Sequence, residues 1–428
     1  MLELLDLRER RERLEPRRLE FDPSVIQAVG AIIQRVRDEG DDCLLDLAQR
    51  YDGAELRERG LVATPEEFGS AERTLPDDLR RAIDALVGRL GELHARQLPS
   101  EWSAARDGVR FGEIVRPIRA AGCYVPGGRA AYPSSVAMTV VPAAVAGVEE
   151  IVVCTPAGAS GDVPPAVLYA AARAGATRVI KTGGAQAIAA LAFGTASVPV
   201  VDRVVGPGNA YVTESKRQLN GLVGVDGLAG PSELTIVADD TADAELIAID
   251  LVAQAEHDPD ASTTLVTTDP SLVERVSKAL DIEVASAGRR DIVEEALRHN
   301  RAVLVADEEH AAQAVDDLAA EHLHVVLEDP RGFAERVRNA GAIFLGPWTA
   351  VSFGDYGVAS NHVLPTGGTA RFASGLRAAD FVTLTSVVEI DEEAARALAP
   401  EVSALARDEG LVGHARSVEV RARRREDL

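Results

Sequence analysis

The fold is decided by residues 150–193, EIVVCTPAGASGDVPPAVLYAAARAGATRVIKTGGAQAIAALAF. Here, and just beyond, short apolar runs rich in β-branched residues alternate with Ala-rich segments of helical spacing. The runs are Glu150–Cys154, Arg178–Lys181 and Arg203–Val205, and the helices are expected at about 164–174, 184–193 and 209–219. Apolar strands that alternate with helices are typical of a parallel sheet covered by helices.

A second series of the same kind begins at Glu233–Ala238 and continues with a helix from about Ala242 to His257. Its further strands are expected at Thr263–Thr267, Ala302–Val305, Val325–Leu327 and Ala342–Leu345. We therefore predict an α/β fold of two Rossmann-like, incomplete parallel-sheet domains. An N-terminal helical arm and a small helical C-terminal tail are expected to flank them.

The domain boundaries are placed from these two series and from the composition of the chain ends. Residues 1–24 are dense in Arg and Glu and are expected to form an arm or a short surface helix. The first α/β domain takes residues 25–120 and 233–378, and the second takes residues 121–232. Residues 379–428 form the tail.

The charge of the chain excludes some partners. The 428 residues include 45 Lys and Arg against 68 Asp and Glu, a net charge of −23. A surface this acidic repels nucleic acid and anionic membranes, so we expect neither as a partner. The N-terminus has no apolar signal segment and the apolar runs are too short to span a membrane, which predicts a cytoplasmic protein.

Two glycine-containing loops each follow a predicted strand and open a predicted helix. They are Gly183-Gly184-Ala185-Gln186 and Gly206-Pro207-Gly208-Asn209. The second departs from the dinucleotide fingerprint because Tyr211 stands at the position of the third glycine. Each loop alone fits either phosphate binding by backbone amides or a tightly packed helix start.

Three groups of residues could bind a metal ion or act as bases. Gln254 and His257 lie one helical turn apart, either as two ligands of one ion or as a structural pair. Asp355 lies in the long irregular segment 346–370 and could add an oxygen ligand. Glu321 and His322, at a helix–strand junction, could act as bases toward water and a hydroxyl group.

The remaining histidines and the cysteines give weaker signals. His324 is expected on an ordinary strand surface, and three histidines are expected on helices without partners: His94, His299 and His310. Glu409 and His414 lie in the tail, where an exposed surface residue is the simpler interpretation. Cys123 and Cys154 could suggest a thiohemiacetal, although a buried strand cysteine is the favoured interpretation of Cys154.

Taken together, these segments resemble the histidinol dehydrogenase family. The matching segments keep the family order from residue 122 to residue 418, whereas the first 100 or so residues and the Arg-rich end match weakly. The segments are GCYVPGG (122–128), GGAQAIAALAFGT (183–195), GPGNAYV (206–212), GPSE (230–233), QAEHDPD (254–260), EHL (321–323), GDY (354–356), SNHVLPTGGTAR (360–371) and EGLVGHARSV (409–418).

The resemblance implies a set of site residues. The implied ligands of one zinc ion per subunit are Gln254, His257, Asp355 and His414. The implied NAD contacts, all in the second α/β domain, are Tyr124, Gln186 and Asn209. The implied substrate contacts are Ser232, Gln254, His257, His322, Asp355, Glu409 and His414. The implied acid–base residues are Glu321 and His322.

The resemblance also implies a reaction: oxidation of L-histidinol to L-histidine through histidinal with two NAD, the last step of histidine biosynthesis. Zinc would position the substrate, His322 would take the hydroxyl proton, and Glu321 would activate water. The tail would form a homodimer with shared active sites. The alternatives are a zinc-dependent hydrolase acting on an imidazole or amide substrate, and a dinucleotide-binding protein without catalysis.

Overall fold

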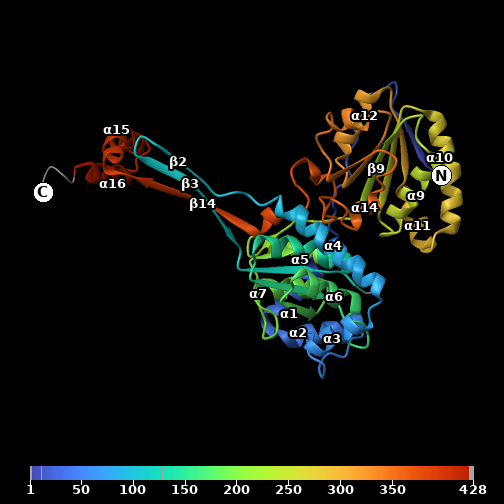
Figure 1. Ribbon diagram of the computed structural model, residues 1–428, viewed down its shortest axis with the longest axis horizontal. Coiled ribbons are helices and arrows are strands. Elements are labelled where there is room, and N and C mark those ends of the chain that lie inside the picture. The colour runs from blue at the N-terminus through green and yellow to red at the C-terminus, as the bar shows by residue number, and fades with distance from the viewer. Residues whose placement is uncertain (1, 11, 128–129, 424–428) are drawn as a thin grey trace. The chain divides into compact units, whose positions relative to one another are not determined.

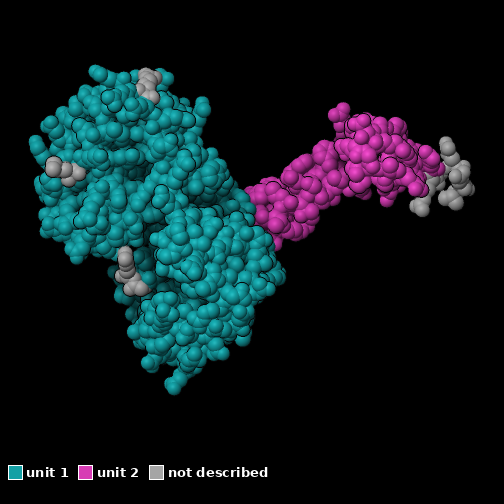
Figure 2. Space-filling model, turned by 180° about the vertical axis from the view of Figure 1, so that it is seen from behind, with its two compact units in different colours: residues 1–97, 118–381 teal, residues 98–117, 382–428 magenta. Residues whose placement is uncertain are grey.

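The computed structural model describes residues 2–10, 12–127 and 130–423. The chain forms two compact units, residues 1–97 with 118–381 and residues 98–117 with 382–428 (Figure 2). Met1 and Arg11 of the expected arm, Gly128 of the GCYVPGG segment and residues 424–428 of the tail lie outside the described residues.

A six-stranded sheet of the first unit is entirely parallel, with the strand order β1-β11-β10-β9-β12-β13 (Figure 1). Its strands are β1 (Glu3–Asp6), β9 (Glu233–Ala238), β10 (Ser262–Thr267), β11 (Arg301–Leu304), β12 (His322–Val326) and β13 (Ala342–Leu345). The helices of this part are α9 (Ala244–Ala255), α10 (Pro270–Ser286), α11 (Arg290–Ala296), α12 (Glu308–Leu318), α13 (Pro330–Ala334) and α14 (Val351–Asp355).

The other sheet of this unit has five parallel strands in the order β6-β5-β4-β7-β8. They are β4 (Ala120–Tyr124), β5 (Glu150–Thr155), β6 (Arg178–Lys181), β7 (Arg203–Val205) and β8 (Gly224–Val225). The helices that follow these strands are α5 (Pro133–Ala146), α6 (Pro165–Ala174), α7 (Gly184–Phe193) and α8 (Ala210–Leu219).

Both sheets have hydrophobic cores on their two faces and an incomplete doubly wound order, which confirms the predicted fold class. In the five-stranded sheet the chain starts at the central strand β4, moves to one side and then returns to the other. The strands β9 to β13 follow the same path in the six-stranded sheet, where β1 is an added edge strand. The direction changes between β4 and β7 in the five-stranded sheet and between β9 and β12 in the six-stranded sheet. These switch points are where loops part and leave room for ligands.

Helices of the first 97 residues pack differently from the expected grouping of residues 25–120 with residues 233–378. They are α1 (Pro23–Glu39), α2 (Asp41–Leu47), α3 (Pro65–Thr74) and α4 (Asp77–Ala95), with a π-helical turn at Ala48–Asp52. Helices α1 and α2 pack on α7 and α8, and α3 and α4 on α5 and α6, so they cover the five-stranded sheet. An apolar helical stripe predicts that a helix is buried, but not against which sheet.

The expected helical arm was wrong in its first residues. Glu3–Asp6 form β1, which adds to β11 at the edge of the six-stranded sheet. Among the described residues before Pro23, no helix occurs. All four side chains of β1 are exposed, so backbone pairing rather than an apolar face makes this strand, and the sequence carries no alternating pattern.

The second unit combines an antiparallel sheet, in the order β14-β3-β2, with two helices. Its elements are β2 (Trp102–Arg106), β3 (Val109–Pro117), β14 (Val382–Ile390), α15 (Glu392–Asp408) and α16 (Val412–Arg423). The expected helical tail is correct for the two helices but missed β14. Most side chains of β14 are exposed, so the strand lacks the alternation of a half-buried strand.

Short 3-10 turns occur at Leu297–His299, Thr369–Arg371 and Ala378–Phe381. Among the helices that the structure describes, none combines the length and the apolar character needed to cross a membrane.

Candidate active site

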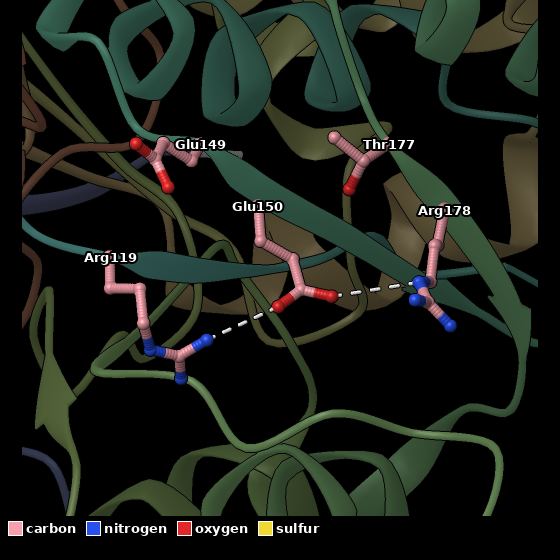
Figure 3. A pocket seen from close by; sticks show the side chains of 5 residues that line it. All are labelled: Arg119, Glu149, Glu150, Thr177 and Arg178. Atoms are coloured by element: carbon pink, nitrogen blue, oxygen red, sulfur yellow. Dashed lines mark hydrogen bonds and ion pairs between the residues drawn. The ribbon is translucent and has the colours of Figure 1, made fainter.

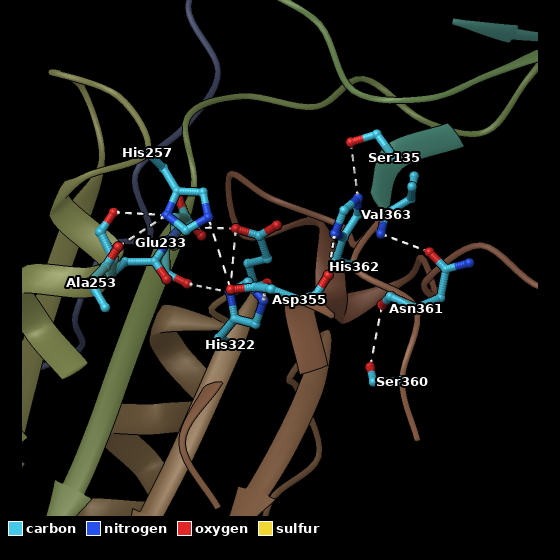
Figure 4. A network of polar contacts seen from close by, with 12 residues as sticks. Ser135, Glu233, Ala253, His257, His322, Asp355, Ser360, Asn361, His362 and Val363 are labelled. Atoms are coloured by element: carbon cyan, nitrogen blue, oxygen red, sulfur yellow. Dashed lines mark hydrogen bonds and ion pairs between the residues drawn. The ribbon is translucent and has the colours of Figure 1, made fainter. Parts of the chain in front are cut away.

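A cluster of ionisable side chains lies where β9 and β12 begin (Figure 4). These strands are neighbours, so Glu233, the first residue of β9, lies close to His322, the first residue of β12. The backbone N–H of Glu233 donates to Glu321 Oε2 at 2.9 Å, and its carbonyl oxygen lies 3.2 Å from His322 Nδ1. A carbonyl only accepts, so this contact places the ring proton on Nδ1 and leaves Nε2 free to take a proton.

Burial sets the protonation of this pair. Glu321 and His322 are both more than nine-tenths buried. Loss of water raises the pKa of Glu321 well above its usual value, and the same cause lowers the pKa of His322 to about 4. At neutral pH His322 is therefore an uncharged imidazole, and the Glu321 carboxylate, once ionised, is a stronger base than an exposed one.

Asp355, the last residue of α14, lies between two histidines. Its Oδ1 is 3.7 Å from His322 Nε2, and its Oδ2 is 3.9 Å from His257 Nε2. Figure 4 shows the three side chains turned toward one another. The structure thus brings together the group that contains His257 and the group that contains His322, two residues that are 65 positions apart in the sequence.

Gln254 and His257 fit a metal site in two respects. His257 Nδ1 lies 3.2 Å from the carbonyl oxygens of Ala253 and Gln254, an arrangement that leaves Nε2 as the nitrogen that could bind a metal ion. The side chain of Gln254 is buried, and its amide nitrogen has no hydrogen-bond partner among the described atoms. The buried amide of Gln254 and the free imidazole nitrogen of His257 could therefore hold a further group, such as a metal ion.

The described part of the chain holds no group of three or more His, Cys, Asp or Glu side chains arranged to hold a metal ion. Gln254, His257 and Asp355 belong to the first unit, and Glu409 and His414 belong to the second. Glu409 follows the end of α15 and His414 lies on α16, and both are exposed. Ser232 directly precedes β9, and its carbonyl oxygen accepts a hydrogen bond from the Ser262 backbone.

His362 was missed by the sequence analysis. Its Nδ1 lies 2.9 Å from the backbone oxygen of Asp355, and its Nε2 lies 3.2 Å from Ser135 Oγ. Ser135 is in the first turn of α5. His362 therefore connects the cluster of ionisable side chains, through Asp355, to the helices of the five-stranded sheet. The only signal in the sequence was the length of the irregular segment that contains His362. That length predicted a functional segment but did not indicate which of its side chains takes part.

The three residues expected to contact NAD lie around the carboxyl ends of the five-stranded sheet. Tyr124 ends β4, and its hydroxyl oxygen accepts a hydrogen bond from the Gly184 N–H at 3.1 Å. Gln186 is buried in the first turn of α7. Asn209 caps α8 by accepting the N–H groups of Tyr211 and Val212. The switch point between β4 and β7 therefore gathers both glycine loops.

A surface pocket at the opposite, amino edge of this sheet contains none of the predicted site residues (Figure 3). Glu150, the first residue of β5, lies 3.3 Å from Arg119 and 3.6 Å from Arg178. Its single carboxylate is shared between the two arginines, so the pocket has the character of a surface ion-pair network.

Expectations about three other histidines were wrong. His310, on α12, is buried, and its Nδ1 accepts the Ala306 N–H at 3.4 Å. His324 is buried rather than on a strand surface, with Nε2 2.9 Å from the Gly346 oxygen and Nδ1 3.1 Å from Asp250. His94 is fully buried and has partners: Nδ1 lies 2.8 Å from Gln97 Oε1, and Nε2 lies 3.2 Å from Asn361. The hydrophobic core covers these rings, and the spacing of residues along the sequence did not predict their burial.

Cysteine chemistry at the site is not supported. Cys123 and Cys154 are free and buried in neighbouring strands of the five-stranded sheet, as favoured for Cys154. Burial raises the pKa of the Cys123 thiol to about 12 and that of Cys154 further. Both stay protonated at neutral pH and are poor nucleophiles.

The doubly wound sheet with glycine loops at its switch point, together with a buried carboxylate–imidazole pair, has the features of a dehydrogenase. The sequence profile described as "Histidinol dehydrogenase" matches residues 15–422. The chain belongs to the histidinol dehydrogenase family.

Individual relatives agree with this assignment along nearly the whole chain. A histidinol dehydrogenase of Parasynechococcus marenigrum is 46% identical over 92% of this chain and 90% of its own. Another, from Methanothermobacter thermautotrophicus, is 44% identical over 98% of both chains. The crystal structure of histidinol dehydrogenase from Elizabethkingia anophelis superposes with a TM-score of 0.93 at 30% identity, over 98% of both chains.

Proposed function

We propose that this protein oxidises L-histidinol to L-histidine through histidinal with two NAD, the last step of histidine biosynthesis. The observation that carries the proposal is the buried pair of Glu321 and His322, placed by Glu233 and facing Asp355. Of the alternatives, a binding protein has no use for two bases buried side by side. A hydrolase would leave the glycine loops of the five-stranded sheet without a role.

The proposed metal is zinc, one ion per subunit, held by Gln254, His257, Asp355 and His414. The free Nε2 of His257 and the unsatisfied amide of Gln254 support this choice of ligands. Imidazole and carboxylate are ordinary zinc ligands, whereas an amide is an uncommon one. Bound zinc would anchor the imidazole and amine nitrogens of histidinol and so orient its carbinol carbon.

The acid–base steps are assigned to neighbouring residues with different environments. His322 accepts the hydroxyl proton at Nε2, because burial keeps this nitrogen unprotonated at neutral pH. The ionised Glu321 then takes a proton from the water that adds to the aldehyde, since burial makes this carboxylate strongly basic. Bound NAD would accept one hydride in each oxidation step, with contacts from Tyr124, Gln186 and Asn209.

The remaining substrate contacts are proposed for residues near this cluster and for the tail. Ser232 and Gln254 come from the first unit, and Glu409 and His414 from the second. The second unit exposes several large apolar side chains that a partner would cover: Leu384, Val388, Leu405 and Val412. We propose a homodimer in which Glu409 and His414 complete the partner's site. The cytoplasmic location stays a prediction.

The direct test of this function is the formation of NADH, followed by its absorbance, when the purified protein meets histidinol. We expect NADH to form with histidinol and histidine to accumulate. A hydrolase would release a cleaved product with no NADH, and a binding protein would do neither.

Removal of the metal should abolish activity and leave the fold intact. The structure has extensive cores on both faces of two sheets, so its folding does not depend on one ion as a zinc finger does. We expect a chelated sample to lose nearly all NADH formation, keep its circular dichroism spectrum and recover activity with added zinc. Full activity after verified metal removal would contradict the proposed ligands.

A further inference from the structure

Lys216 and Asp226 form a buried ion pair directly beside the Gly206–Asn209 loop. Lys216 lies on α8 and is 2% exposed, and its Nζ lies 2.6 Å from Asp226 Oδ1. Taking two charges out of water is costly, and such a pair is stable only when further hydrogen bonds satisfy both groups. The acid–base steps proposed above make no use of this pair.

Two further hydrogen bonds of the pair converge on Gly206, and Asp226 Oδ1 also accepts the Gly227 N–H at 2.9 Å. Lys216 Nζ donates to the Gly206 carbonyl oxygen at 2.6 Å. Asp226 Oδ2 accepts the Gly206 N–H at 2.7 Å. Both backbone polar groups of Gly206 are therefore held by the same ion pair, and charge-assisted bonds of this kind are stronger than neutral ones.

Gly206 is the point at which the chain leaves β7 and passes Tyr124. Its φ of 113° suits glycine, and a Cβ at this position would lie 2.1 Å from the Tyr124 carbonyl oxygen. The ion pair thus fixes the backbone that lies against Tyr124 and leads, three residues later, to Asn209. These are two of the three residues expected to contact NAD.

Other buried polar residues of α8 make hydrogen bonds to the start of α7 and to the loop before β9. Ser215 Oγ donates to the carbonyl oxygen of Ala185 at 3.2 Å, next to Gln186. Thr213 Oγ1 donates to the Ala229 carbonyl oxygen at 2.8 Å. Helix α8 therefore contacts both the start of α7, which bears Gln186, and the loop that leads to Asn209, with Lys216 as its charged residue.

We propose that Lys216 and Asp226 are positioning residues for the dinucleotide, which they serve by holding Gly206 from both sides. This inference rests on the proposed binding of NAD at the switch point between β4 and β7. The pair acts on cofactor affinity and leaves the proton transfers to Glu321 and His322, which lie on the other sheet. Its loss should weaken NAD and NADH binding more than it changes the chemistry.

The test uses a variant in which both charges are removed together, Lys216→Met with Asp226→Asn, so that no lone charge stays buried. We expect the Kd for NADH, measured by its fluorescence with histidine present, to rise about tenfold, as does the KM for NAD. The KM for histidinol and kcat should stay within about twofold. An interaction that stabilises the bound cofactor equally in the ground state and in the transition state affects the KM for that cofactor alone when it is lost. Lys216→Arg, which keeps charge and donors, should bind NADH more tightly than the double variant.

The matched control is Arg217→Met with Glu214→Gln. This ion pair is also on α8, with a buried carboxylate and a 2.6 Å contact, but it has no hydrogen bond to either glycine loop. We expect the control to bind NADH as the unaltered protein does. If both double variants lose affinity equally, a general effect on α8 explains the loss and the inference is wrong.

The remaining outcomes separate this inference from the proposed function. An unaltered protein that neither binds NADH nor forms it from histidinol contradicts the proposed function itself. If the unaltered protein does both and the folded double variant keeps its NADH affinity, only the positioning role is wrong. Should the double variant not fold, Lys216→Gln with Asp226→Asn decides, because it keeps hydrogen-bonding amides at both positions and leaves no lone buried charge: we expect weaker NADH binding, and native affinity overturns the inference.

Discussion

Glu321→Gln is expected to lower the rate of histidinal oxidation by about 10²–10⁴-fold, the usual contribution of a general base, and to lower histidinol oxidation less. His322→Asn should lower histidinol oxidation by a similar factor. The substitutions are mild, since Gln keeps an oxygen acceptor for the Glu233 N–H and Asn can still donate to the Glu233 carbonyl. Each variant is assayed separately with histidinol and with histidinal.

The control for this pair is His299→Asn, at a histidine whose side chain is 43% exposed and lies outside the cluster. We expect this variant to oxidise both substrates at native rates. A Glu321→Gln variant that oxidises histidinal at the native rate would show that another group activates the water. Equal losses on both substrates in both variants would contradict the proposed division between the two bases.

Mixing two inactive variants, His257→Ala and His414→Ala, is expected to restore activity if the site is shared between subunits. Each hybrid dimer would contain one site with both substitutions and one site with neither. About half of randomly mixed dimers are hybrids, so activity should approach about a quarter of the native value, as two-fold symmetry requires. The measurement is NADH formation after subunit exchange, which mass-labelled subunits verify.

The same mixing experiment discriminates between arrangements of the second unit. If His414 served the site of its own chain, no hybrid would contain an intact site and no activity would return. Complete subunit exchange without recovery would therefore contradict the shared site. The control mixture pairs His257→Ala with Asp355→Ala, two proposed ligands that belong to the same unit, and should stay inactive in either arrangement.

The parallel sheets were predictable because their strands are buried on both faces. Glu233–Ala238 and Arg203–Val205 have the bounds expected from their apolar runs. The expected series omitted β1, β2, β3, β4, β8 and β14. Of these, β1, β2 and β14 have mostly exposed side chains and are held by backbone pairing. The strand β4 is fully buried, but its Ala120, Ala121 and Gly122 have little preference for a strand. Apolar patterning reports burial, so it does not detect a strand that buries little.

The site was predictable in its residue types but not in its geometry. Local spacing paired Gln254 with His257 and Glu321 with His322, whereas the approach of Asp355 to both histidines depends on which strands are neighbours. The cluster also lies at the amino ends of β9 and β12, although ligands of such sheets usually bind at the carboxyl ends. The backbone role of Glu233 and the contacts of His362 are equally non-local, so no motif revealed them.

The measurement that tests the central claim most directly is the number of NADH molecules formed per histidinol consumed. The reaction is run to completion with limiting histidinol and excess NAD, and histidine is quantified in the same sample. The account predicts a ratio of about two with histidine as the product, because two hydrides leave the same carbon. A ratio near one, with histidinal accumulating in solution, would contradict it.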